Sequence, residues 1–223
     1  MRKFKSAFKS EELKIYLSIV GVSTICIFIN IFKLYPNALN ALTDAYFQVA
    51  SIVTSTGFSS VDFNLWPEFS KTLIVLLMFV GACAGSTGGG LKVSRVAILC
   101  KDVANNLRHY FTPRRVKQVR FEGKNLEEEE ISSVKSYFFI FTLVMLISLI
   151  IISFNGFDFT TNVTSVLTCV NNSGPGLNAV GPASNFANFS VLSKCVFMFD
   201  MLAGRLEFIP MLALLNPIIY RKK

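Results

Sequence analysis

The chain has 223 residues, of which 52% are hydrophobic and 16% charged, and its formal net charge is +8. Soluble domains carry about 25% charged residues, so this composition argues against an ordinary soluble enzyme and against a disordered chain. Five scattered cysteines without a Cys-x-x-Cys pair argue against a zinc site and against a disulfide framework.

Four stretches are apolar and long enough to cross a bilayer, which takes about 20 residues. They comprise residues 15–32, 72–91, 136–154 and 195–220. Buried helices of a soluble bundle would be amphipathic, whereas these stretches are apolar all round. The pattern therefore predicts an all-α polytopic membrane protein.

Most basic residues lie at three places, residues 1–14, 92–135 and the tail 221–223. Lys and Arg accumulate on the cytoplasmic side of membranes, so both termini and the 92–135 segment are predicted to be cytoplasmic, in a plasma (inner) membrane. Basic runs beside a membrane more often contact lipid headgroups than nucleic acid. Membrane lipid is the expected partner and no nucleic acid is expected, with a nucleic-acid patch at residues 109–120 as the weaker alternative.

The connection after the first span contains NALTDAYFQVASIVTSTGFSS at residues 40–60. Its apolar stretch of about 14 residues is too short to span a bilayer and fits a re-entrant segment. The glycine that follows allows carbonyls to turn inward, where a ring of carbonyls can replace the hydration shell of a cation. The predicted filter residues here are Thr54, Ser55, Thr56 and Gly57.

The second apolar stretch contains six consecutive small residues, Gly85, Ser86, Thr87, Gly88, Gly89 and Gly90. Each glycine costs a helix about 1 kcal/mol relative to alanine, so the helix is predicted to open there into an intramembrane loop. A phosphate-binding loop is the alternative. That motif requires Lys and then Ser or Thr after its last glycine, whereas Leu91, Lys92 and Val93 follow here.

A second connection, DFTTNVTSVLTCVNNSGPGL at residues 158–177, has the same plan as the first. Its predicted filter residues are Asn171, Asn172, Ser173 and Gly174. Subtracting 57 from 174 gives an offset of 117, which also lays Gly88 on Arg205. The chain therefore reads as two parallel copies of span, pore helix, filter and span. Two ordinary external loops are the alternative.

Arg205 lies inside the fourth apolar stretch, where a charge is costly unless it faces water or a partner. The offset places Arg205 at the depth of the glycine-rich run, whose free carbonyls would accept guanidinium hydrogen bonds. We expect Arg205 and residues 85–90 to form a gate below the filter. Local charge satisfaction is the alternative, although Asp200 and Glu207 are not three or four positions away.

These patterns divide the chain into a cytoplasmic segment, a first repeat, a cytoplasmic linker, a second repeat and a tail. The corresponding residues are 1–14, 15–104, 105–133, 134–220 and 221–223. The sequence contains no nucleophile–base spacing and no metal-ligand cluster, so neither an enzyme nor a cofactor is expected.

Four motifs, taken in order, resemble the second half of the Trk/Ktr potassium-uptake proteins and are most similar to the Trk-type membrane subunit. They are TSTGF at 54–58, GACAGSTGGGLK at 81–92, NNSGPGLNAVGP at 171–182 and LAGRLEFIP at 202–210. The resemblance extends from about residue 14 to residue 217, and the ordered set of motifs is highly specific.

The resemblance implies four membrane–pore–membrane repeats around one pore, with Gly57 and Gly174 as the filter glycines of the third and fourth. It implies K⁺ as the transported ion at the filter carbonyls, residues 85–90 as the intramembrane gate and Arg205 as the arginine that faces this gate. It also implies dimers and a cytosolic nucleotide-binding regulatory subunit, which would meet the basic cytoplasmic face.

The chain departs from this pattern in length, because it contains two repeats and two filter segments cannot surround an ion. Another two-repeat half, or a second copy of this chain, would complete the pore. We therefore expect K⁺ uptake through such a pore. The alternatives are a cation channel subunit of other selectivity and a non-conducting or regulatory half.

Overall fold

The structure, a computed structural model, describes residues 10–86, 88–112, 118–206 and 210–211. The described residues are mainly helical, as predicted. The helices are α2 (Glu11–Ile31), α3 (Ala38–Val53), α4 (Glu68–Met78), α5 (Val93–Phe111), α6 (Glu128–Ser153), α7 (Phe159–Asn171) and α8 (Val191–Leu206). Short 3-10 turns are η1 (Phe32–Leu34), η2 (Phe63–Leu65), η3 (Asn178–Val180) and η4 (Phe186–Asn188). Strands β1 (Arg120–Phe121) and β2 (Lys124–Asn125) pair as an antiparallel hairpin.

Among the described residues, two helical segments are long and apolar enough to cross a membrane, Glu11–Leu34 and Glu128–Ser153. Their most apolar windows have mean hydropathies of 2.2 and 2.4, and only 17% and 22% of these windows are buried. The core helix of a soluble protein would be mostly buried, so these helices present their apolar surface outward. They coincide with the predicted spans 15–32 and 136–154.

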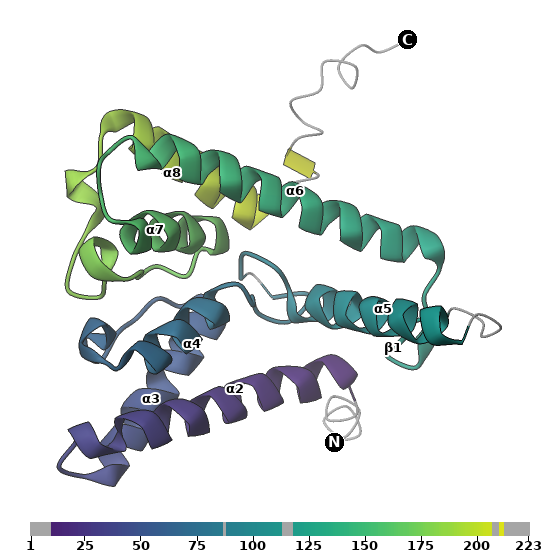
Figure 1. The fold of residues 1–223 in the computed structure, drawn as a ribbon, viewed down its shortest axis with the longest axis horizontal. Coiled ribbons are helices and arrows are strands. Elements are labelled where there is room, and N and C mark those ends of the chain that lie inside the picture. Colours follow the sequence, from purple (N-terminus) through teal and green to yellow (C-terminus); the bar gives the residue numbers. More distant parts are fainter. Residues whose placement is uncertain (1–9, 87, 113–117, 207–209, 212–223) are drawn as a thin grey trace.

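The helices form two successive groups of three that share one plan (Figure 1). The first group is α2, α3 and α4, and the second is α6, α7 and α8. An offset of 117 residues carries Glu11, where α2 begins, onto Glu128, where α6 begins. The same offset carries α3 onto residues 155–170, which largely overlap α7. The tandem repeat predicted from the sequence is therefore present in the fold.

Each group has its own apolar core. In the first, Ile27, Val49 and Ile74 come from the three helices and are fully buried. In the second, Phe141, Val166 and Phe197 come from the corresponding three helices and are at most 3% exposed. Short helices α3 and α7 are thus each held between two neighbours, which fixes where their carboxyl ends point.

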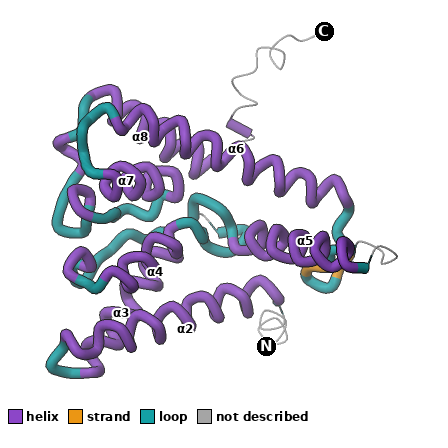
Figure 2. Tube along the Cα trace, viewed as in Figure 1, coloured by secondary structure: helices purple, strands orange, loops and turns teal. Residues whose placement is uncertain are grey.

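The predicted span 72–91 is not one continuous helix, because α4 ends at Met78 and α5 begins at Val93. The helix opens before the glycine-rich run rather than within it. Gly81 explains the early opening: its N–H donates to the Leu91 carbonyl at 2.7 Å, and a Cβ there would lie 2.4 Å from the Gly89 oxygen. Residues 79–86 and 88–92 therefore lie in a closed loop between α4 and α5 (Figure 2).

Part of the fourth predicted span lies outside the described residues. Helix α8 is described through Leu206, so residues 207–209 and 212–220 of the predicted 195–220 stretch have no structural account. Thr87 of the predicted gate is also outside the described residues. The hairpin end of the molecule, where α2 and α6 begin and β1 and β2 pair, lies opposite the end where α3 begins (Figure 1).

Candidate functional site

The two predicted filter segments have the same backbone conformation. Ser55 and Asn172 both adopt a left-handed conformation, with φ of +56° and +54°. Gly57 and Gly174 do so as well, with φ of +78° and +92°. Positive φ is uncommon outside glycine, so its recurrence at an offset of 117 shows that both connections fold into one type of loop.

The first hydrogen bonds of each loop also correspond. The Thr56 N–H donates to the Ser51 carbonyl at 2.9 Å, and the Ser173 N–H donates to the Thr168 carbonyl at 3.0 Å. Both bonds direct the N–H groups of the segment back toward the end of the preceding helix. The carbonyls of the two segments do not take part in these bonds.

These carbonyls are available to a ligand. In the part of the chain that the structure describes, no backbone N–H donates to a carbonyl of residues 54–57 or 171–174. The Asn171 carbonyl accepts one hydrogen bond, from the Ser55 hydroxyl at 3.3 Å. Helices α3 and α7 end at these segments, so the negative ends of their dipoles lie there too. Free carbonyls and helix C-termini together favour a desolvated cation.

The two segments touch each other through their glycines. A Cβ on Gly57 would lie 3.0 Å from the Ser173 carbonyl oxygen, and a Cβ on Gly174 would lie 3.1 Å from the Gly57 Cα. Glycine is thus required at both positions for two reasons, the left-handed backbone and the close approach. The structure brings the two predicted filters to one place.

The glycine-rich run lies directly against the second filter. A Cβ on Gly89 would lie 2.9 Å from the Asn171 carbonyl oxygen, and one on Gly90 would lie 1.9 Å from Asn171 Oδ1. Gly88 faces the first filter, since its Cβ would be 3.6 Å from Ser55 Oγ. Residues 88–90 therefore pack against both predicted filter segments. Gly85 and Ser86 are exposed.

Arg205 lies near this region but is not joined to the loop. Its side chain is exposed, and among the described residues it has no hydrogen bond or ion pair. Its neighbour Gly204 packs so tightly that a Cβ would lie 1.8 Å from the Val170 carbonyl oxygen, and Asn172 Nδ2 donates to the Met201 carbonyl at 3.2 Å. Helix α8 thus supports the second filter, whereas a bracing role for Arg205 stays a prediction.

Sequence reasoning missed the role of Asp200, which it weighed only as a partner of Arg205. Asp200 is fully buried in α8, and its Oδ1 accepts a hydrogen bond from Ser148 Oγ of α6 at 2.8 Å. The carboxyl group thereby ties α6 to α8. The available signal was an acidic residue in an otherwise apolar stretch, which indicates a buried partner.

Comparisons with known proteins agree with this geometry. A family model described as TrkH, cation transport protein, matches residues 19–218. The chain is 34% identical to the Trk system potassium uptake protein TrkH of Salmonella typhimurium over 99% of this chain and 46% of that protein. It is 35% identical to the Trk system potassium uptake protein TrkI of Halomonas elongata over 83% of this chain and 38% of that protein.

A solved structure matches as well. The crystal structure of the potassium transporter TrkH from Vibrio parahaemolyticus superposes with a TM-score of 0.87 at 32% identity, covering 96% of this chain and 46% of that one. The chain thus spans about half the length of the relatives it matches.

Proposed function

Because the chain belongs to the TrkH family of cation transport proteins, we propose that it forms two quarters of a pore that conducts K⁺ into the cell. The observation that carries this proposal is the pair of matching loops. Among the described residues, their carbonyls at 54–57 and 172–174 accept no backbone hydrogen bond, the Asn171 carbonyl accepts only the Ser55 hydroxyl, and their glycines meet. The relatives are named as potassium uptake proteins, which favours K⁺ over other cations.

In this proposal the filter carbonyls replace the hydration shell of K⁺, and no chemical bond is made or broken. The C-terminal ends of α3 and α7 add a negative potential at the same place. Residues 85–90 act as the gate, because residues 88–90 already contact both filters from one side. Arg205 and Thr87 are assigned to the same gate on the basis of the sequence alone.

Completion of the pore requires two more filter segments, from another two-repeat half or from a second copy of this chain. One observation favours such a partner. A hollow of about 610 Å³ opens beside the second filter, lined by Asn172 and Gly174 of the filter and by apolar residues of α8 such as Phe197 and Met201. A lone half with this surface open would be non-conducting, which is the second candidate function.

We further propose that the hairpin end faces the cytoplasm of a plasma (inner) membrane protein. The described residues at that end include Lys101, Arg120, Lys124 and Lys135, in keeping with the positive-inside rule. A cytosolic nucleotide-binding regulatory subunit would dock on this face. The two repeats, 15–104 and 134–220, would then enter and leave the membrane on the same side.

The test is growth of a potassium-uptake-deficient cell at low K⁺, with this chain expressed alone or together with a first-half protein of the family. We expect rescue only with the added half, and loss of rescue in Gly57→Asp. Rescue that survives Gly57→Asp would contradict the filter assignment. Uptake measured in parallel with K⁺ and Na⁺ separates a potassium pore from a cation pore of other selectivity. Co-purification of the two halves without flux would support the non-conducting alternative.

A further inference from the structure

The glycine-rich loop is attached to the first turn of α2, a helix far from it in sequence. Glu12 Oε1 accepts a hydrogen bond from the Ala84 N–H at 2.6 Å. Ala84 directly precedes Gly85, the first residue of the predicted gate. Hydrogen bonds to a carboxylate are about twice as strong as neutral ones, so this contact is well suited to fix the start of the loop.

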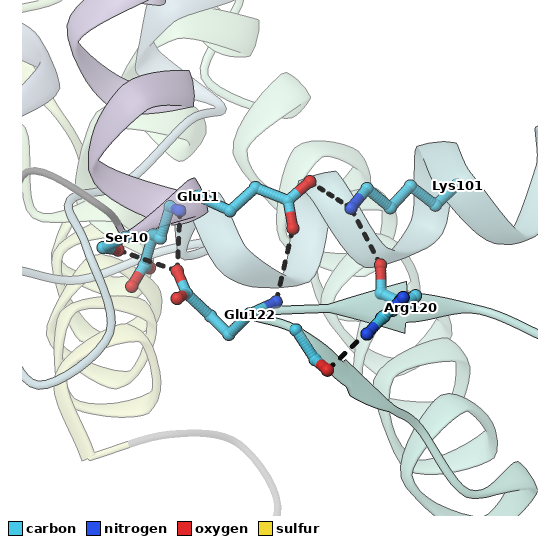
Figure 3. Close-up of polar contacts among 7 residues, drawn as sticks. Ser10, Glu11, Lys101, Arg120 and Glu122 are labelled. Carbon is cyan, nitrogen blue, oxygen red and sulfur yellow. Dashed lines mark hydrogen bonds and ion pairs between the residues drawn. The ribbon is translucent and has the colours of Figure 1, made fainter.

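Glu12 is itself held in place by the tip of the β-hairpin. Glu122 Oε1 accepts hydrogen bonds from the Ser10 hydroxyl at 2.7 Å and from the Glu12 backbone N–H at 2.9 Å (Figure 3). The N–H groups in the first turn of a helix have no partner within the helix. Ser10 Oγ caps α2 by accepting from the Leu13 N–H, and Glu122 supplements this cap from outside, at the residue that reaches the loop.

A second set of contacts ties α2 and the hairpin to α5. Glu11 Oε2 accepts from the Glu122 N–H at 3.3 Å, and Glu11 Oε1 pairs with the Lys101 ammonium. Lys101 also donates to the Arg120 carbonyl at 2.8 Å (Figure 3). The start of α2, the hairpin and α5 thus form one polar cluster at the hairpin end.

The hairpin presents Glu122 on a well-defined turn. Residues Glu122 and Gly123 form a two-residue connection with φ of +50° and +77°, as in a type I′ turn. The twist of this turn matches the twist of its strands, so Glu122 lies on a short, rigid element. Glu122 is exposed, and a molecule bound at this face could reach it.

We propose that Glu12 is a positioning residue for the intramembrane loop and that the hairpin tip sets the position of Glu12 through Glu122. Displacement of the hairpin removes the Glu122 hydrogen bonds to Ser10 and to the Glu12 N–H, moves Glu12 and frees the Ala84 N–H. The loop can then leave the filter segments that it packs against. The meaning of this motion as gating rests on the proposed function, whereas the coupling itself does not.

The loop carries its own reporter, Cys83, next to Ala84. The four other cysteines are replaced by alanine in the 223-residue chain, and the rate at which a soluble maleimide modifies Cys83 is measured in detergent. Glu12→Ala is expected to raise this rate at least about threefold, because it removes the acceptor that holds the loop. Glu129→Ala, which removes an exposed acid outside the cluster, is the matched control.

Glu12→Gln separates position from charge. The Glu12 carboxylate acts electrostatically on the Cys83 thiol, and both variants remove this charge. The glutamine keeps a side-chain oxygen that can accept from Ala84, so its rate is expected to lie between wild type and Glu12→Ala. Equal rates for the two variants, or an equal rise in Glu129→Ala, would overturn the positioning role.

The second part of the experiment tests the hairpin with Glu122→Ala, and Lys124→Ala in the same hairpin is its control. A faster reaction of Cys83 in Glu122→Ala alone supports coupling through the tip, and no difference between the two overturns it. The Glu122→Ala measurement still tests the coupling if Glu12→Ala fails to fold. Because the readout needs no ion flux, a failure of the proposed transport in the rescue experiment is distinguishable from a failure of the coupling.

Discussion

At Gly57 and Gly174 the two repeats approach each other mainly through backbone atoms. Each combines a positive φ with an approach that leaves no room for a Cβ. The left-handed conformation costs a non-glycine residue about 1–2 kcal/mol, and the contact adds to this cost. The conformation of both predicted filters therefore depends on the absence of a Cβ at these two positions.

Alanine at either filter glycine is expected to destabilise the protein by more than about 1 kcal/mol and, in a rescue-competent pair of halves, to reduce K⁺ uptake at least about tenfold. Thermal unfolding and uptake measure the two effects. Gly156→Ala is the matched control, because Gly156 has φ of +75° but no atom within 4 Å of its missing Cβ. Comparable loss of uptake in Gly156→Ala would show that backbone strain anywhere, rather than the filter contact, is responsible.

The Ser148–Asp200 hydrogen bond is a second single-residue feature with a measurable effect. Ser148→Ala removes the donor to a fully buried carboxyl group. Loss of a partner for a buried polar group costs about 1–3 kcal/mol, so the unfolding midpoint is expected to fall. Ser153→Ala, at an exposed serine that bonds only its own helix turn at Ile150, is expected to change the midpoint little. A similar effect of both variants would contradict a structural role for the buried pair.

At the scale of elements, helix α7 begins at a side-chain cap, Asp158. Asp158 accepts a hydrogen bond from the Thr161 N–H at 3.0 Å and another from Asn178 Nδ2 at 2.8 Å. Asp158 therefore fixes the start of α7 and also ties it to η3, the turn that follows the second filter. Helix α7 and the segment after the second predicted filter are thus joined at the N-terminal end of α7.

Asp158→Ala is expected to lower the free energy of unfolding by about 0.5–2 kcal/mol, the range for loss of an N-cap. Asp158→Asn retains a capping oxygen and is expected to lose much less. Denaturant or thermal unfolding in detergent measures both. Equal destabilisation by the two variants would mean that the negative charge, and not the cap, stabilises α7.

The hairpin gives a pH-dependent prediction. Hydrogen bonds from the Glu12 N–H and the Ser10 hydroxyl lower the pKa of Glu122 below its ordinary value of 4.5. A lowered pKa in the folded state means that the carboxylate stabilises the fold above pH 4.5, and that this contribution is lost as the pH falls through the folded pKa. Below about pH 4.5 the unfolding midpoint of the wild type is expected to fall more steeply than that of Glu122→Gln. Parallel curves, with Glu129→Gln as a control, would exclude this contribution.

The sequence predicts some of these elements better than others, for physical reasons. Hydropathy locates α2 and α6 because lipid-facing helices are apolar on all sides, and the offset of 117 locates the two loops that share positive-φ glycines at Gly57 and Gly174. The end of α4 at Met78 was not predictable, since it depends on a hydrogen bond that closes the loop between Gly81 and Leu91. The Glu12–Ala84 hydrogen bond could not be predicted from the sequence either, because its partners lie 72 positions apart.

At the scale of the whole molecule, the two repeats are joined where the loop of the first packs on the filter of the second. Gly90 of the first repeat has φ of +77°, and its missing Cβ would lie 1.9 Å from Asn171 Oδ1 of the second. The remaining atoms of Asn171 are farther away, with Cβ at 3.1 Å. The amide group is therefore the part of Asn171 that excludes a larger residue from the loop.

This contact predicts a non-additive pair of substitutions across the repeats. Gly90→Ala is expected to destabilise strongly, and Asn171→Ala to relieve part of that cost by removing the amide, with a coupling of about 0.5–3 kcal/mol in unfolding free energy. The matched control is Gly85→Ala, which has φ of +83° in the same loop and no atom within 4 Å of the missing Cβ. Its combination with Asn171→Ala is expected to be additive within about 0.5 kcal/mol, since residues without a shared contact do not couple. Additivity in both pairs would show that the loop and the second filter do not contact each other, and a gate made of residues 88–90 would then lose its structural basis.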